Sequence, residues 1–230
     1  GLNIIFLNKV ITAVEEWLQE EYPDRYVTYT TAAYFSHTTP PVDYNKETGK
    51  YTPHSDLVIP HEKLSVMLTY IGLPSWTYPL NSEEQVINQS FYQNFKGWAS
   101  ICDNLSIYAY GINYRNFLMN FNDWSSLQSN LKFCYENGVH EWYQLACTRG
   151  SSPAFEELRI YVLSQLLWDT SLSYQELAID FINAYYGDAA PEIMEYFNLT
   201  ITTNIKNITE QNASQACTTG YPGNANFWPY

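Results

Sequence analysis

The sequence predicts an α/β fold, and the stretch between Trp98 and Trp168 carries the clearest evidence for it. Two short apolar strands, expected at 104–110 and 139–146, alternate with helices expected at 125–137 and 153–168. The helices carry apolar residues three and four positions apart, whereas turn residues bound the strands. Strands that alternate with helices indicate a parallel sheet with right-handed crossovers. In such sheets functional residues gather where the strands end.

Residues before this stretch extend the same pattern. A helix is expected at 3–21, because apolar residues recur there at the spacing of one buried helix face: Ile4, Leu7, Ile11, Val14 and Leu18. Strands are expected at 26–34 and 64–71, and a polar loop, with a hairpin around Gly49, lies between them. A helix at 82–101 then leads into the central stretch.

Helices dominate the residues after the central stretch. Ser173 and Glu176 form a capping box, in which each side chain satisfies a backbone N–H at the start of a helix. Gly187 is a suitable end for that helix, and Pro191 opens another that is expected to reach about residue 198. The residues from 201 to 230 are polar and predict a loose tail.

The number of elements favours half of an eight-stranded barrel. Four strand–helix units are expected, with extra C-terminal helices, and a (β/α)8 barrel has eight such units. We therefore predict that residues 1–200 form the C-terminal half of a TIM-type barrel, cut from a longer protein. A small open α/β sheet is the alternative. Because no Gly-rich phosphate loop follows any expected strand, a nucleotide-binding version of that sheet is disfavoured.

Composition excludes several classes of function. The formal net charge is −13 and only 11 Lys and Arg residues are scattered along the chain, so a nucleic acid is not an expected partner. No apolar run approaches the roughly 18 residues of a membrane helix. None of the four cysteines forms a C-x-x-C pair, and His54, His61 and His140 have no carboxylate or histidine at metal-ligand spacing. We expect no metal and no cofactor.

Several sequence runs resemble the bacterial family called domain of unknown function 4838. The runs are Ala33-Tyr34 with Pro40-Pro41, Trp98 to Asn104, Asn137-Gly138-Val139, Glu157-Leu158-Arg159 with Leu166 to Asp169, and Ala184 to Gly187 with Ala189-Ala190-Pro191. Together they span most of the chain up to about Phe197. Members of this family look like glycoside hydrolase barrels of the α-glucuronidase and β-hexosaminidase kind. The resemblance implies a carbohydrate ligand, a secreted or cell-surface location, and a first barrel half upstream of Gly1.

The chain departs from the family pattern at two acidic positions. One family strand ends Ile-Trp-Asp-Tyr, and the next ends Phe-Glu-Gln; here Ala109 and Gln144 stand at the Asp and Glu positions. A glycosidase generally needs two carboxylates, and neither alanine nor glutamine can titrate. The resemblance therefore implies that any catalytic acid lies outside this chain, and no catalytic residue is assigned within it.

Aromatic and amide side chains at strand ends are the candidate sugar contacts. Tyr34, Trp76 and Tyr110 can stack on sugar rings or pack in the core and loops. Gln144 can hold a sugar hydroxyl or a water, or can close the top of the barrel as a satisfied polar group. Asn113 can contact a ligand or form a turn.

Two basic side chains complete the set of candidates. His37 precedes the double proline, and its near-neutral pKa suits acid–base chemistry, although an ordinary loop histidine is the alternative. Arg149 follows the last strand and can pair with a uronate carboxylate, or can simply be exposed.

Two functions follow from these expectations. The first is a carbohydrate-active barrel of glycoside hydrolase type. The second is a degenerate barrel that binds glycans, or positions other modules, without cleaving a bond.

Overall fold

The computed structural model describes residues 1–69, 79–81, 86–111, 118, 120–145 and 153–210. The chain divides into two compact units, which are described separately. The first unit comprises Gly1–Tyr70, Gln93–Tyr108 and Asn137–Tyr143, and the second comprises Ile71–Tyr92, Ala109–Glu136 and Gln144–Tyr230.

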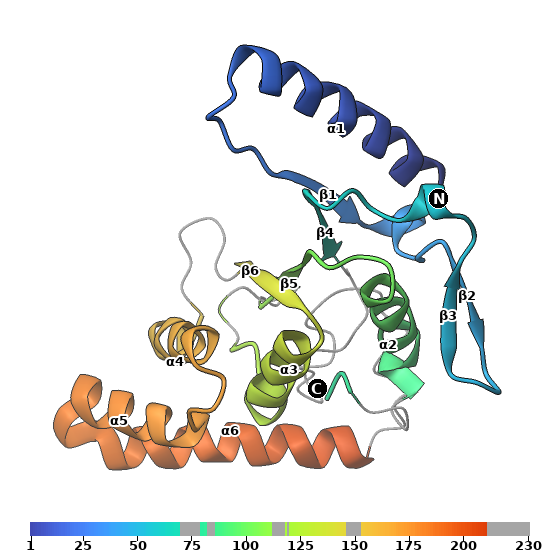
Figure 1. Ribbon diagram of the computed structural model, residues 1–230. Helices are drawn as coiled ribbons and strands as arrows, with labels where there is room; N and C mark the ends of the chain where they lie inside the picture. Colours follow the sequence, from blue (N-terminus) through green and yellow to red (C-terminus); the bar gives the residue numbers. More distant parts are fainter. Residues whose placement is uncertain (70–78, 82–85, 112–117, 119, 146–152, 211–230) are drawn as a thin grey trace. The chain divides into compact units, whose positions relative to one another are not determined.

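The structure contains a four-stranded sheet with the strand order β1-β4-β5-β6 (Figure 1). Its strands are β1 (Tyr29–Ala33), β4 (Leu64–Thr69), β5 (Leu105–Tyr110) and β6 (Val139–Leu145). β4 is parallel both to β1 and to β5, with Leu68 opposite Ala33 on one side and Ile107 on the other. The sheet and its helical connections confirm the predicted α/β class. All four strands lie within the predicted ranges.

The two faces of this sheet differ in chemistry. Leu64, Val66 and Leu68 alternate along β4 and are almost completely buried, as are the matching apolar residues of β5. Apart from Met67 on β4, the intervening positions of both strands carry hydroxyl side chains, and the Ser65 and Ser106 hydroxyl oxygens lie 3.1 Å apart. Parallel sheets covered on both faces usually have nearly continuous apolar strands. This sheet therefore has one apolar face and one polar face.

Helix α1 (Leu2–Glu21) buries the predicted stripe, including Ile4, Ile11 and Leu18. Asn8 ties the helix to the segment before β4, because its Nδ2 donates to the Ile59 carbonyl at 2.7 Å and its Oδ1 accepts from the His61 N–H at 2.9 Å. Four large apolar side chains of α1 are nevertheless exposed: Leu2, Phe6, Val10 and Trp17.

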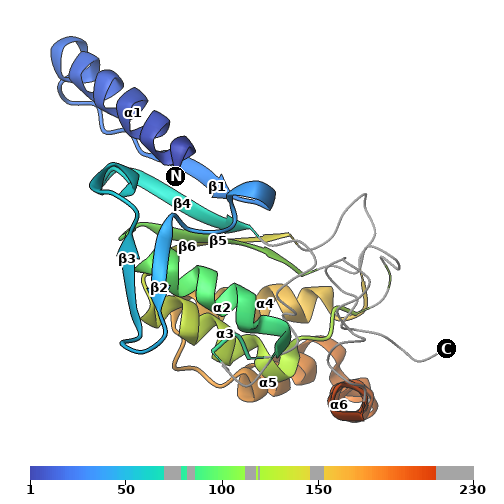
Figure 2. The same ribbon diagram turned by 90° about the vertical axis from the view of Figure 1, so that its right-hand side faces the viewer.

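A hairpin and two 3₁₀ turns separate β1 from β4. Turn η1 (Phe35–His37) follows β1, and η2 (Asp56–Val58) precedes β4. The hairpin of β2 (Val42–Asn45) and β3 (Lys50–Pro53) extends away from the sheet (Figure 2). Its turn contains Gly49 at a φ of +67°, a left-handed conformation that suits glycine. The hairpin predicted around this glycine is confirmed.

Helix α2 (Val86–Ala99) follows β4 and brings aromatic residues to the interior. Phe91, Phe95 and Trp98 are all buried, as their shared helix face predicts. The Trp98 indole donates a hydrogen bond to the Thr38 carbonyl at 2.9 Å, which joins the end of α2 to the residues after η1.

The second unit is mainly helical, with α3 (Trp124–Glu136), α4 (Glu156–Trp168), α5 (Tyr174–Tyr186), η3 (Gly187–Ala189) and α6 (Ala190–Glu210). Helix α5 packs beside both α4 and α6 (Figure 1). The Ser173 hydroxyl accepts the Glu176 N–H, which confirms the predicted N-terminal cap of α5.

Two helix boundaries differ from the prediction. Helix α4 begins at Glu156 rather than Pro153. Helix α6 continues to Glu210, although a polar tail was expected from residue 201. The Thr200 and Thr202 hydroxyls donate to the carbonyls of Phe197 and Asn198, so these polar side chains are satisfied within the helix. None of the helices that the structure describes is long and apolar enough to cross a membrane.

Candidate functional site

Three tyrosines come together on the polar face of the sheet, and we call Tyr34, Tyr108 and Tyr143 the tyrosine cluster. Tyr34 follows Ala33, which is level with Leu68 and Ile107, so the next residues along the strands, Tyr34, Thr69 and Tyr108, share one row. Residues in one row of a parallel sheet face the same side. All three tyrosines belong to the first unit.

Tyr108 and Tyr143 form the best defined pair of this cluster. Their ring centroids lie 4.6 Å apart with an interplanar angle of 26°, a stacked arrangement. Burial raises the pKa of the Tyr108 phenol, and the neighbouring Tyr143 and Tyr34 add to that rise. Tyr143 remains 53% exposed, so the pair presents an aromatic surface to solvent.

The residue after Tyr34 holds an unusual backbone conformation. Phe35 has a φ of +46°, which is costly for a bulky non-glycine residue. Its ring lies 4.0 Å from that of Tyr34, and its side chain is largely exposed. An unfavourable backbone conformation therefore accompanies a further aromatic ring beside the tyrosine cluster, at the end of β1.

The chemistry of the tyrosine cluster suits binding rather than acid–base catalysis. Phenols donate and accept hydrogen bonds, and their rings offer apolar faces, but their ordinary pKa of about 10 makes them poor proton donors at neutral pH. Glu141 lies two residues before Tyr143 on β6 and is exposed. Alternation along the strand puts this carboxylate on the same face as Tyr143 and opposite to Gln144.

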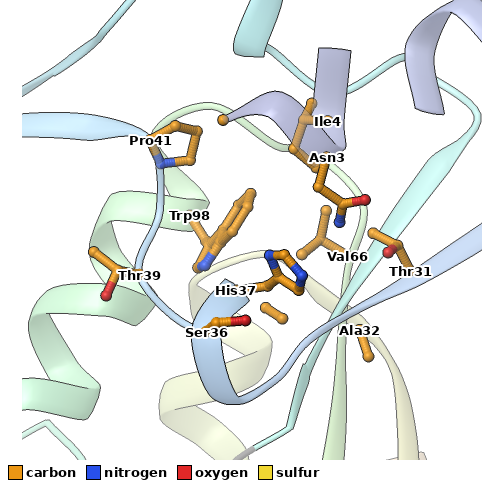
Figure 3. A pocket seen from close by; sticks show the side chains of 12 residues that line it. Asn3, Ile4, Thr31, Ala32, Ser36, His37, Thr39, Pro41, Val66 and Trp98 are labelled. Atoms are coloured by element: carbon orange, nitrogen blue, oxygen red, sulfur yellow. The ribbon is translucent and has the colours of Figure 1, made fainter. Parts of the chain in front are cut away.

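His37 lies in a separate cavity of the first unit (Figure 3). Side chains of α1, β1, η1, β4 and α2 line it, among them Asn3, Ser36, Val66 and Trp98. The cavity volume of about 40 Å³ is far below the roughly 300–1,000 Å³ of small-molecule pockets, so it suits ordered water rather than a sugar ring. Tyr34 does not line this cavity, although the His37 backbone N–H donates to the Tyr34 carbonyl at 3.0 Å.

Tyr110 and Gln144 belong to the second unit. Tyr110 is buried, which favours the packing alternative for this residue. Gln144 is partly exposed and lies against Gly111, where a Cβ atom would collide with its amide nitrogen. Trp76, Asn113 and Arg149 lie outside the described residues.

Comparison with known proteins identifies the family of this chain. Residues 1–198 match the family model described as "Domain of unknown function (DUF4838)". The chain belongs to the DUF4838 family. No curated protein and no solved structure shows significant similarity to it. Membership confirms the family resemblance of the sequence. The DUF4838 description names no activity, so the function must be argued from the site.

Ala109 and Gln144, where the sequence resemblance led us to expect acidic residues, have distinct surroundings. Ala109 is buried on the apolar face of β5, beside the core residue Ile107. Gln144 retains partial exposure and a polar amide, so it can still contact a ligand or a water. Among the residues that the structure describes, no three His, Cys, Asp or Glu side chains form a group that could hold a metal ion.

Sequence reasoning missed Tyr108 and Tyr143 as site residues. Alternation places Tyr108 and Tyr110 on one face of their strand, and Tyr143 on the opposite face of its strand from Gln144. The sequence does not reveal which face of the sheet other elements cover. The usable signal was the Ser106–Tyr108 alternation against the apolar Leu105–Ile107–Ala109 set. That pattern identifies the face of β5 that carries Ser106 and Tyr108, but not the neighbouring strand that brings Tyr143 beside it.

Proposed function

We propose that this DUF4838 chain binds glycans and that the tyrosine cluster contacts the sugar. The stacked and half-exposed Tyr108–Tyr143 pair, beside the carboxyl end of β1, is the observation that carries the proposal. Ligand sites in parallel α/β sheets lie at the carboxyl ends of the strands. An aromatic surface with a few oriented polar groups suits a sugar, whose ring has both C–H faces and hydroxyls.

We further propose that the sheet is the C-terminal half of a (β/α)8 barrel of glycoside hydrolase type. The apolar face of the sheet then packs against the outer ring of helices, and the other face, which is more polar than the branched apolar interior usual in such barrels, lines the interior. Among the described strands β1 pairs only with β4, so its other edge is free to accept a further strand. The exposed apolar residues of α1 are consistent with more protein packing there. A secreted or cell-surface location belongs to this proposal.

If the complete barrel hydrolyses glycans, its general acid comes from outside this chain. Retaining and inverting glycosidases use a pair of carboxyl groups, and the positions at Ala109 and Gln144 provide none. The second candidate function is a degenerate barrel that binds or positions glycans without turnover. The burial of Ala109 favours it, because even a small side chain there is enclosed.

Calorimetric titration of the full-length protein tests the binding proposal. Glucuronic acid, N-acetylglucosamine and oligosaccharides that contain them are suitable ligands, with chromogenic glycosides run in parallel to detect turnover. Tyr143→Ala should weaken binding, whereas Tyr143→Phe should retain most of the affinity because it keeps the ring. Tyr135→Ala is the matched control, since Tyr135 is an exposed tyrosine on α3.

The outcomes separate the alternatives. Binding with turnover supports a glycosidase whose acid lies elsewhere in the protein. Binding without turnover supports the degenerate barrel. Equal affinity in the wild type and Tyr143→Ala, for every sugar that binds, would show that the tyrosine cluster does not contact the sugar.

A further inference from the structure

Three ionisable side chains are buried together in the second unit: Asp123, Glu156 and Arg159 are 5%, 3% and 2% exposed. Asp123 precedes α3, whereas Glu156 and Arg159 lie in the first two turns of α4. Burying a charged group is expensive unless a partner of opposite charge compensates it. The charge balance among these three groups therefore constrains which of them can be ionised.

The Arg159 guanidinium bonds the Asp123 carboxylate and the Phe121 backbone carbonyl. Its Nη1 lies 2.6 Å from Asp123 Oδ1, and its Nη2 donates to the Phe121 carbonyl. The guanidinium also lies over the Trp124 ring, at 4.7 Å from the ring to Cζ. One cation is thus matched by one carboxylate, that of Asp123.

Glu156 is the second buried carboxyl group of these three, and the single buried cation among them is already paired with Asp123. Neither of its oxygens has a hydrogen-bond partner, although the side chain is buried. Burial raises the pKa of Glu156; Glu157 and Asp123 add to the rise, while Arg159 opposes it. A second carboxylate here would be an uncompensated buried negative charge, so the neutral acid is the form that suits this environment.

The backbone at the start of α4 is strained as well. Phe155, the residue before the helix, has a φ of +66° and provides no side-chain cap. Its ring packs 5.2 Å from Phe197 and 5.7 Å from Tyr196, both on α6. Aromatic packing against α6 therefore holds a strained turn that also contains an unpartnered carboxyl group.

We propose that the first turn of α4 is a proton-linked switch. With Glu156 protonated, the turn stays packed against α6; when Glu156 loses its proton, the carboxylate moves to water and the turn separates from α6. The packed form is stabilised fully below the pKa of an exposed glutamate, about 4.3. That stabilisation declines as the pH rises toward the higher pKa of the buried group, because the open form binds fewer protons.

Hydrogen exchange of the full chain between pH 4.5 and 8 tests this switch. After correction for the intrinsic pH dependence of exchange, the amides of the first turn of α4 should lose protection about tenfold per pH unit between the exposed and buried pKa values. In Glu156→Gln, which is neutral and nearly isosteric, the corrected protection should not depend on pH. Glu157→Gln removes the exposed neighbour in the same turn, and should keep the pH dependence but move it to lower pH, because Glu157 adds to the raised pKa of Glu156.

The same pH dependence in Glu156→Gln and the wild type would overturn the proposal. A measurement on the wild type covers the case in which Glu156→Gln does not fold. The ¹³C shift of the Glu156 carboxyl carbon should titrate at a higher pH than those of exposed glutamates, and an ordinary midpoint would contradict a neutral buried acid.

Discussion

The phenol ring of Tyr143 on β6 stacks on that of Tyr108 on β5, with the ring centroids 4.6 Å apart. The two residues are 35 positions apart in sequence, and only the pairing of neighbouring strands brings them together. The stack gives the half-exposed Tyr143 a fixed orientation. A ligand surface that is ordered before binding loses less side-chain entropy when the ligand arrives.

The first prediction concerns the inner ring of this stack. Tyr108→Phe keeps the aromatic face and should bind sugar nearly as well as the wild type. Tyr108→Ala removes the support of Tyr143 and should weaken binding by about 0.5–1.5 kcal/mol, the range for an aromatic pair. Isothermal titration of both variants checks this. Equal weakening of binding in Tyr108→Phe and Tyr108→Ala would show that the hydroxyl, not the ring, matters.

The second prediction concerns the buried ion pair of Asp123 and Arg159. Asp123→Asn leaves the guanidinium buried without a counter-charge and should lower the free energy of unfolding by about 3–5 kcal/mol. Urea denaturation measures the change. Lys132→Ala is the control, because Lys132 and Glu136 form an exposed pair at 3.8 Å that should contribute little. A similar small effect of both substitutions would mean that Asp123 does not compensate Arg159.

The third prediction concerns the loss of folding stability at acidic pH. The Lys63 ammonium and the Tyr29 hydroxyl both bond the Glu15 carboxylate, and they lower its pKa. A lowered pKa stabilises the fold above the unfolded-state pKa, and this contribution is lost as the pH falls through the folded-state value. Glu15→Gln should therefore flatten the loss of stability below about pH 4.3. Glu16→Gln, at an exposed neighbour, should leave the loss of stability at acidic pH unchanged.

The fourth prediction concerns the loss of folding stability at alkaline pH, to which Tyr29 contributes. Burial and the Glu15 carboxylate raise the pKa of Tyr29 to about 12. A raised pKa stabilises the fold below the unfolded value of about 10, and that contribution is lost as the pH rises toward 12. Tyr29→Phe should remove this part of the alkaline loss, as melting temperatures between pH 8 and 11 would show. An unchanged slope in Tyr29→Phe would contradict the assignment.

The fifth prediction concerns close packing between α2 and the loop after η1. A Cβ atom at Gly97 would lie 2.6 Å from Pro40 Cγ, a ring atom with little freedom to move. Gly97→Ala should therefore destabilise the protein by about 1–3 kcal/mol, despite the better helix propensity of alanine. Thermal or chemical denaturation is sufficient, with Ser90→Ala, at an exposed site of the same helix, as control. A more stable Gly97→Ala variant would show that the loop can yield.

Local signals in the sequence predicted local structure well. The Ser173 cap, the turn at Gly49 and the buried stripe of α1 depend on residues a few positions apart, and all three are present. The extension of α6 was missed because threonine is read as a loop residue unless its hydroxyl is known to bond backward along the helix.

The site depends on relationships that a single sequence does not contain. In the sequence, Glu156 is only an acidic residue of the kind that a helix start favours, yet in the structure it is buried near Asp123, which is 33 positions earlier. Tyr34 and Gln144 were recognised as strand-end residues, but only the strand register shows that Tyr34 joins Tyr108, while alternation sets Gln144 apart from Tyr143. Burial and register arise from tertiary packing, and composition does not encode them directly.

The β2–β3 hairpin has a practical consequence for these experiments. The Gly49 turn has open space around it, and its Asn45 side chain accepts hydrogen bonds from the two backbone N–H groups at Glu47 and Thr48. In a variant in which Cys147 and Cys217, which lie outside the described residues, are replaced, a cysteine introduced at Thr48 would give a fluorophore an attachment point on a self-contained turn. Cys102 and Cys134 are buried, and burial raises the pKa of both thiols, so at neutral pH they should react far more slowly with the dye.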